Sequence, residues 1–87
     1  MTSQTPADLP TAGDVTAALT TIWARCLQQE RVGMDEDFFQ LGGHSLIAME
    51  LLGEIERAFG VGVSMAELYE FPTVRQVARI IVAADRR

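Results

Sequence analysis

The residues of this chain with the clearest chemical potential lie in the stretch FFQLGGHSLIAMELL, from Phe38 to Leu52. Two glycines and a histidine lead directly into Ser45, and the residues that follow have helical spacing. A serine in this position has three candidate roles. It can cap the helix through its side-chain oxygen, attack a substrate as a nucleophile, or carry a group that another enzyme attaches to its hydroxyl.

The capping role explains only part of the pattern. A capping box pairs an N-cap Ser or Thr with Glu or Gln three residues later, and the two side chains bond to each other's backbone N–H groups. Residue 48 is Ala, so the second half of that box is missing at Ser45. Ser45 as an N-cap therefore stays open as an interpretation, without the support of a full box.

Catalysis by Ser45 lacks its supporting residues. A serine nucleophile needs a base within hydrogen-bond reach, a group that orients the base, and donors for the developing oxyanion. His44 is the only histidine of the chain, and the side chains of sequence neighbours rarely point at each other. The pentapeptide GHSLI at residues 43–47 also lacks the second glycine of a G-x-S-x-G elbow. We therefore expect no self-contained catalytic site.

Covalent attachment fits the same residues better. Gly42 and Gly43 carry no side chains that would obstruct an approaching enzyme, so we expect Ser45 to be exposed. The start of a helix offers free N–H groups and the positive end of the helix dipole, and both favour a phosphate. These residues therefore favour a phosphodiester on Ser45.

Composition and charge restrict the class of protein. The 87 residues are 48% hydrophobic and 22% charged, which is typical of one folded domain. A formal net charge of -5 repels nucleic acid and anionic membrane surfaces, so we expect the partners to be proteins with basic docking surfaces. We expect the protein to be a monomer.

The single cysteine, Cys26, excludes an internal disulfide, and no Cys and His set has metal-ligand spacing. We expect Cys26 to act as a small apolar side chain. Without a signal-peptide or membrane-spanning pattern, the sequence predicts a cytoplasmic location.

Apolar residues at helical spacing predict two longer helices in the first two thirds of the chain. The first runs over about 15 residues, begins with Thr11 or Asp14 as its cap, and has one apolar stripe. The second begins at or beside Ser45 and ends at Gly60. The two stripes comprise Val15, Ala18, Leu19, Ile22, Trp23 and Cys26, and then Ala48, Leu51, Leu52, Ile55 and Phe59.

Two capping-box patterns predict the remaining helices. Ser64 with Glu67 opens a short helix through about Tyr69, and Thr73 with Gln76 opens the last one. The apolar face of that last helix comprises Val74, Val77, Ala78 and Ile81.

The segment from Glu30 to His44 has no sustained period, so it is expected to form a long loop anchored by Phe38 and Phe39. No segment alternates over enough residues to predict a strand. The sequence therefore predicts an all-α bundle of three main helices and one short helix.

The run DEDFFQLGGHSLIAMELLGEIERAFGVGVSMAELYEFPTV closely resembles the carrier-protein family, in particular the peptidyl carrier proteins, or thiolation domains, of nonribosomal peptide synthesis. The similarity extends from about Val15 to Ile81. Its most specific part is the motif DFF at residues 37–39 followed by LGGHSL at residues 41–46, and the later FPTV agrees with it.

The resemblance implies a four-helix bundle of the acyl-carrier-protein type in which Ser45 carries a 4'-phosphopantetheine arm. It implies a phosphopantetheinyl transferase that uses coenzyme A and Mg²⁺, and a thioester of an aminoacyl or peptidyl group on the arm's thiol. The carrier itself is then not an enzyme. Its implied partners are an adenylation enzyme and condensation, tailoring or thioesterase enzymes.

Within this frame we expect a flexible lead-in at residues 1–10, a carrier domain at 11–84 and a tail at 85–87. Met1, the polar lead-in and the early end at Arg87 suit a discrete protein. An excised domain of a larger synthetase would have the same features. Two alternatives stay open: an acyl or aryl carrier of a polyketide or siderophore-type pathway, and an unmodified helical interaction module.

Four residues near Ser45 are candidates for partner docking. Leu46 and Met49 lie off the apolar stripe of their helix, one turn apart, and so can form an exposed apolar patch. His44 is expected mainly to be a solvated loop residue, and its functional alternative is docking or orientation of the arm. Phe39 is expected mainly to anchor the loop and also to shape the surroundings of the arm.

Overall fold

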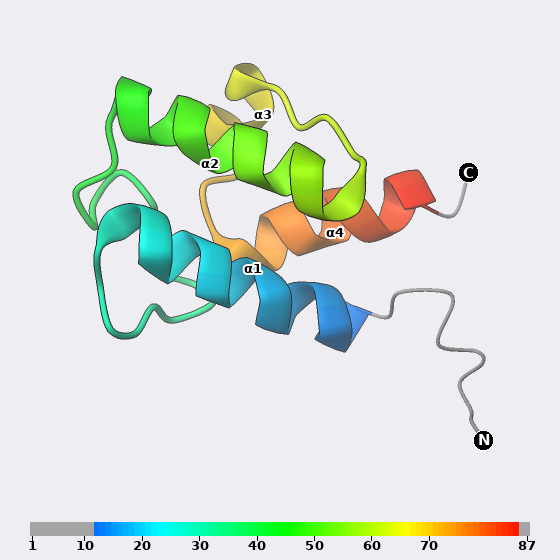
Figure 1. Cartoon of the computed structure of the whole chain (residues 1–87), viewed down its shortest axis with the longest axis horizontal. Coiled ribbons are helices and arrows are strands. Elements are labelled where there is room, and N and C mark those ends of the chain that lie inside the picture. Colours follow the sequence, from blue (N-terminus) through cyan, green and yellow to red (C-terminus); the bar gives the residue numbers. More distant parts are fainter. Residues whose placement is uncertain (1–11, 86–87) are drawn as a thin grey trace.

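The computed structural model describes residues 12–85, and this part of the chain contains four helices and no strand. They are α1 Ala12–Leu27, α2 Ser45–Phe59, α3 Met65–Glu70 and α4 Val74–Asp85 (Figure 1). The prediction of three main helices and one short helix is confirmed. The expected lead-in at residues 1–10, the candidate cap Thr11 and residues 86–87 of the expected tail lie outside the described residues.

The bundle places the start of α2 at one end of the molecule. α1 packs against both α2 and α4, and α3 packs against α2. Figure 1 shows that α2 begins at the end of the bundle where α1 ends, away from the start of α1 and the end of α4. In the described part of the chain, no helix has the length and apolar character needed to cross a membrane.

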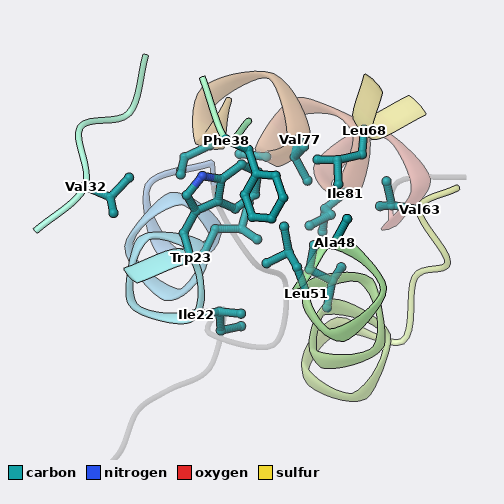
Figure 2. Packing of buried hydrophobic residues seen from close by; sticks show 14 of the residues in the cluster. Ile22, Trp23, Val32, Phe38, Ala48, Leu51, Val63, Leu68, Val77 and Ile81 are labelled. Atoms are coloured by element: carbon teal, nitrogen blue, oxygen red, sulfur yellow. The ribbon is translucent and has the colours of Figure 1, made fainter. Parts of the chain in front are cut away.

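The buried core is formed by the predicted stripes together with the long loop. Trp23 of α1 and Phe38 of the loop are both fully buried, and Figure 2 shows their rings together beside Leu51 of α2 and Val77 of α4. The Nε1–H group of Trp23 has no hydrogen-bond partner among the described residues. The indole therefore stabilises the core by apolar and aromatic packing alone.

The stripes are confirmed with two differences. Val74, Val77, Ala78 and Ile81 are all buried. Ala18, expected on the stripe of α1, is exposed, whereas Leu27 at the end of the same helix is buried. An α-helix has 3.6 residues per turn, so its apolar stripe drifts slowly around the helix surface. The buried face of α1 therefore includes Leu27 near its end and leaves Ala18 exposed.

The ends of α1 and α2 use the same left-handed backbone with different residues. Gly60 has φ 70° and its N–H donates to the carbonyl of Glu56 at 2.8 Å, as the sequence predicts. The residue after α1 is Gln28, with φ 55°. A side chain makes this conformation costly, which is why the sequence offered no terminal signal at this point.

The starts of α3 and α4 are capped as predicted, the second with a variation. Ser64 Oγ accepts a hydrogen bond from the Glu67 N–H at 3.0 Å, and Glu67 Oε1 accepts one from the Ser64 N–H at 2.9 Å. Thr73 Oγ1 accepts from the Gln76 N–H at 3.2 Å. The Gln76 amide oxygen then accepts from the Thr73 hydroxyl at 2.9 Å, in place of the backbone N–H that the full box would use.

Candidate functional site

The loop before α2 is fixed by Phe38. Its side chain is fully buried, and its ring meets Trp23 edge to face with centroids 5.5 Å apart. Its N–H donates to the carbonyl of Pro72, just before α4, at 2.8 Å. A side-chain anchor and a backbone anchor at one residue tie the loop to Trp23 of α1 and to the segment just before α4. The predicted anchoring role of Phe38 is confirmed.

Asp37 orders the turn that follows. Its Oδ1 accepts hydrogen bonds from the N–H groups of Phe39 at 2.8 Å and Gln40 at 3.3 Å. Its carbonyl accepts from the N–H of Leu41 at 3.1 Å. Aspartate commonly organises turns by bonding backbone N–H groups two and three residues later. The acidic residue of the DFF motif is therefore structural.

The two glycines allow the chain to pass close to Phe38. The N–H of Gly43 donates to the carbonyl of Phe38 at 3.0 Å, and a Cβ added to Gly43 would lie only 2.3 Å from Cε2 of the Phe38 ring. Gly42 has φ 104°, a conformation that side chains rarely adopt. The sequence analysis assigned these glycines to accessibility, and the structure adds a requirement for close packing and backbone geometry.

Ser45 is the first helical residue of α2, and His44 is the N-cap. His44 has an extended backbone, φ -143° and ψ -177°, and its carbonyl accepts the N–H of Ala48 at 2.7 Å. No side chain caps this helix, so the interpretation of Ser45 as an N-cap is wrong. Ser45 is exposed, and its hydroxyl has no hydrogen-bond partner among the residues that the structure describes.

The surroundings of Ser45 are suited to an anion. The first turn of α2 contains no acidic residue, and a helix start carries partial positive charge from its free N–H groups. The ion-paired carboxylate of α2 belongs to Glu54, about two and a half turns after Ser45. It accepts a hydrogen bond from Arg25 at 2.9 Å and pairs with Arg57 at 3.2 Å. An exposed hydroxyl at a helix start with no acidic residue in its first turn fits a phosphodiester.

Leu46 and Met49 are exposed, with 74% and 63% of their surface accessible. His44 is exposed beside them. The sequence prediction of an apolar patch next to Ser45 therefore matches the placement of these residues. Docking of partners by these residues stays a prediction.

Phe39 stacks on Tyr69, a residue that the sequence did not indicate as part of the site. Its ring is half-buried, meets Phe38 edge to face at 5.1 Å, and stacks on Tyr69 of α3 with centroids 4.8 Å apart and ring planes 9° apart. Tyr69 is 55% exposed. The sequence contained no pairing signal, because 30 residues separate two aromatic side chains that meet only in the folded chain.

The early part of the loop is tied to α4. Arg75 bonds both carboxylate oxygens of Asp35, at 2.7 and 3.1 Å, and its N–H donates to the carbonyl of Met34 at 3.0 Å. The hydrogen bonds from Arg75 lower the pKa of Asp35, and the charge of Arg79 acts in the same direction. This clip joins the loop to α4, in addition to the bond from Phe38 to Pro72 just before that helix.

Neither metal chemistry nor a reactive thiol is evident at the site. In the range 12–85, no three His, Cys, Asp or Glu residues are grouped as metal ligands would be. Cys26 is half-buried in α1. Burial raises its pKa, and the charges of Glu50 and Glu54 raise it further. A thiol with a raised pKa is a poor nucleophile.

Comparison with known proteins gives a consistent result. The family model described as "Phosphopantetheine attachment site" matches residues 17–81. Surfactin synthase subunit 1 of Bacillus subtilis (strain 168) is 42% identical over 65 residues, which cover 75% of this chain and 2% of that protein. The chain spans only about one fiftieth of the length of that curated relative, and other relatives are matched over 1–2% of their length.

Solved structures with the same fold include carrier proteins. A chain in the structure of the phosphopantetheine transferase Sfp in complex with coenzyme A and a peptidyl carrier protein has a TM-score of 0.80 and 32% identity, over 86% of this chain and 96% of that one. The solution structure of an active site mutant peptidyl carrier protein has a TM-score of 0.82 and 30% identity, over 91% and 87%.

Proposed function

This chain belongs to the phosphopantetheine-attachment family, and from that membership we propose that it is a peptidyl carrier whose Ser45 bears 4'-phosphopantetheine. The carrier unit is proposed to span residues 11–84. Its partners are a phosphopantetheinyl transferase, an adenylation enzyme, and condensation, tailoring or thioesterase enzymes of nonribosomal peptide synthesis. The similarity to two solved structures of peptidyl carrier proteins supports a peptidyl carrier over an acyl or aryl carrier.

The observation that carries this proposal is the state of Ser45. The residue is exposed, its hydroxyl is unbonded among the described residues, and the first turn of α2 has no acidic side chain. Serine is among the preferred N-cap residues, and Ser64 serves as one here. Within residues 12–85 the hydroxyl of Ser45 makes no structural hydrogen bond, so it can be modified without the loss of one.

The modification balances as a transfer of phosphopantetheine from a phosphoanhydride to a phosphodiester. Ser45 Oγ bonds to the phosphorus of the phosphopantetheine unit, the P–O bond of the pyrophosphate bridge breaks, adenosine 3',5'-bisphosphate leaves, and the hydroxyl proton is released. The transferase supplies the catalysis. When bound, the arm supplies a terminal thiol on which an aminoacyl or peptidyl group is held as a thioester.

We propose that the chain itself has no catalytic role. Its part is to hold Ser45 at a rigid helix start, to expose the attachment point, and to leave the cargo intact. The only thiol of the chain, Cys26, is half-buried and has a raised pKa, so it competes poorly for a thioester. A tether attached to this body raises the effective concentration of the cargo at each partner in turn.

Intact-mass measurement tests the attachment. The purified chain is incubated with coenzyme A, Mg²⁺ and the transferase Sfp, with Ser45→Ala treated in parallel. We expect the wild type to gain the mass of one phosphopantetheine and Ser45→Ala to gain nothing. Folded wild type that gains no mass, or a Ser45→Ala variant that gains the same mass, contradicts the proposal.

We also propose that Leu46, Met49 and His44 dock partner enzymes beside the attachment point. Neighbouring exposed apolar side chains can mark a site of protein contact, and methionine adapts to several partners. Leu46→Ala and Met49→Ala should raise the KM of the transferase for the carrier while leaving the fold unchanged. Met34→Ala, an exposed apolar residue in the loop away from α2, is the matched control. Equal KM values for all three variants would contradict the docking role.

A further inference from the structure

A small hollow lies between the segment that follows α3 and the middle of α4. It has a volume of about 160 Å³ and is lined by Phe71, Gln76, Arg79 and Ile80. The last three residues have the spacing i, i+3 and i+4 on α4, so they share one face of that helix. Phe71 is the C-cap of α3 and is 36% exposed. The hollow therefore combines a cation and an amide with two apolar side chains.

The cation of the hollow is not paired within the described chain. Three other arginines form ion pairs within residues 12–85, whereas Arg79 forms none and is exposed. Asp35 lies within range of its charge, but both carboxylate oxygens of Asp35 bond to Arg75. Glu70 is exposed and makes no ion pair in the same part of the chain. The guanidinium of Arg79 is therefore available to an anion from outside.

The amide of Gln76 has a fixed orientation. The hydroxyl oxygen of Thr73 accepts a hydrogen bond from the backbone N–H of Gln76, so the hydroxyl proton is left to donate to another acceptor. That acceptor is the amide oxygen of Gln76, at 2.9 Å. Because the oxygen is held toward Thr73, the amide nitrogen points away from it and keeps its two N–H donors. The hollow therefore offers hydrogen-bond donors from both Gln76 and Arg79.

The size and chemistry of the hollow indicate what it can hold. Pockets for small organic ligands usually have volumes of about 300–1,000 Å³. A hollow of about 160 Å³ is smaller than these and fits a single side chain. Two donor groups, one of them cationic, favour a carboxylate, whereas the apolar surfaces of Phe71 and Ile80 favour methylene groups beside it. Glutamate is the side chain that has both.

We propose that this hollow is a docking site for a glutamate side chain of a partner protein. Its carboxylate accepts from the Arg79 guanidinium and the Gln76 amide, and its methylenes lie on Phe71 and Ile80. The net charge of -5 attracts partners that are basic overall. One acidic residue on such a partner meets a positive charge here in one orientation and like charges in others, so the site fixes how the partner sits on the carrier.

Titration with matched peptides tests the site on the unmodified chain, so the result does not depend on attachment at Ser45. The probes are capped pentapeptides with a central glutamate or a central glutamine between two leucines. Binding is followed by amide chemical shifts of the ¹⁵N-labelled protein. We expect saturable shifts at residues 71, 76, 79 and 80, and about two- to fivefold tighter binding of the glutamate peptide. The net charge of the chain predicts the opposite order, because it repels an acidic peptide.

Three variants locate the preference for glutamate. Arg79→Gln should remove it. Gln76→Glu should remove it as well, because a carboxylate replaces the amide donors while an oxygen is kept for the hydroxyl of Thr73. Arg31→Gln is the matched control, since it removes the same charge from an exposed position outside the hollow, and it should leave the preference unchanged. Circular dichroism of each variant confirms that the helices are retained.

Several outcomes would overturn the proposal. Equal affinities for the two peptides, or tighter binding of the glutamine peptide, would do so. A preference for glutamate that persists in Arg79→Gln would place its origin elsewhere. A preference that Arg31→Gln reduces to the same extent would mean that overall charge decides binding. Shifts centred outside the hollow, with none at residues 71, 76, 79 and 80, would also contradict the assigned site.

Discussion

Ser45 and Ser64 both stand at the start of a helix, and the structure uses them in opposite ways. Ser64 is the N-cap of α3 and exchanges two hydrogen bonds with Glu67, at 2.9 and 3.0 Å. Ser45 is the first residue inside α2, follows an N-cap that makes no side-chain bond, and is exposed. The same residue type thus stabilises one helix and is left free on the other.

The difference shows where the stability of each helix start comes from. α3 has six residues and is capped by its own side chains. α2 lacks a cap, and its start is held from outside by the loop, through buried Phe38, the close passage of Gly43, and the clip between Asp35 and Arg75. Because the loop stabilises the start of α2, the hydroxyl of Ser45 is not needed as a cap. Variants at the two helix starts can therefore separate local support from support by the loop.

Exchanging the two serines for alanine should give opposite results in two measurements. Ser45→Ala should abolish phosphopantetheine attachment and change the free energy of unfolding by less than about 0.5 kcal/mol, as for most exposed positions. Ser64→Ala should be modified normally and lose about 1 kcal/mol, because the cap of α3 is removed. Urea denaturation and intact mass measure the two effects. A large loss of stability in Ser45→Ala would show that its hydroxyl has a structural role.

Gly43→Ala should remove the support that the loop gives to α2. The added Cβ would lie 2.3 Å from a carbon of the buried Phe38 ring, so the ring or the backbone must move. We expect a loss of about 1–3 kcal/mol in the free energy of unfolding, which is typical of overpacking.

Gly62→Ala is the matched control for this change. A Cβ at Gly62 meets nothing within 4 Å, and its φ is not in the left-handed range. Replacing glycine there should be neutral or stabilise the protein by up to about 1 kcal/mol, since alanine restricts the unfolded chain. Urea denaturation of both variants measures the difference, and equal stability would show that the passage beside Phe38 is not restrictive.

The two serines also differ in how far their states could be predicted from the sequence. The capping box at Ser64 was predictable, because its partners lie within one turn of each other and follow a fixed pattern. The helices were predictable from their apolar period for the same reason. The free state of Ser45 followed in part from the missing Glu or Gln at residue 48. Its family resemblance then identified the chemistry.

The supports of α2 were not predictable in detail. The stack of Phe39 on Tyr69 and the pairing of Asp35 with Arg75 join side chains 30 and 40 residues apart. Local patterns hold no information on such contacts, which depend on how the helices pack. The position of the N-cap at His44 was also missed, because a helix start is the least certain boundary in a sequence and histidine is a poor cap.

His44→Asp should give α2 the local cap that it lacks. An aspartate at the N-cap can accept from a free N–H of the first turn and is favoured by the helix dipole, so we expect a gain of about 0.5–1 kcal/mol in the unmodified protein. After attachment at Ser45 the gain should be smaller, because the phosphodiester and the carboxylate repel each other. Urea denaturation of both forms measures this, and an equal gain in both would place the phosphate away from the helix start.

Asp35→Asn should have the smallest effect and the clearest dependence on pH. Bonds from Arg75 lower the pKa of Asp35 below its usual value, so the ionised form is bound more strongly in the folded state than in the unfolded one. That contribution is complete above the unfolded pKa and is lost as the pH falls through the lowered folded pKa.

Wild type and Asp35→Asn should therefore differ slightly near neutral pH and converge in acid. Both partners are exposed, and such pairs contribute little and weaken with salt. Urea midpoints measured across the acid range at low and high salt check this, with Glu30→Gln, an exposed acid elsewhere in the loop, as the control. A difference that persists in acid would mean that Asp35 supports the loop through its shape or hydrogen bonding rather than its charge. In that case none of the three residues that support the start of α2, namely Phe38, Gly43 and Asp35, would act through charge.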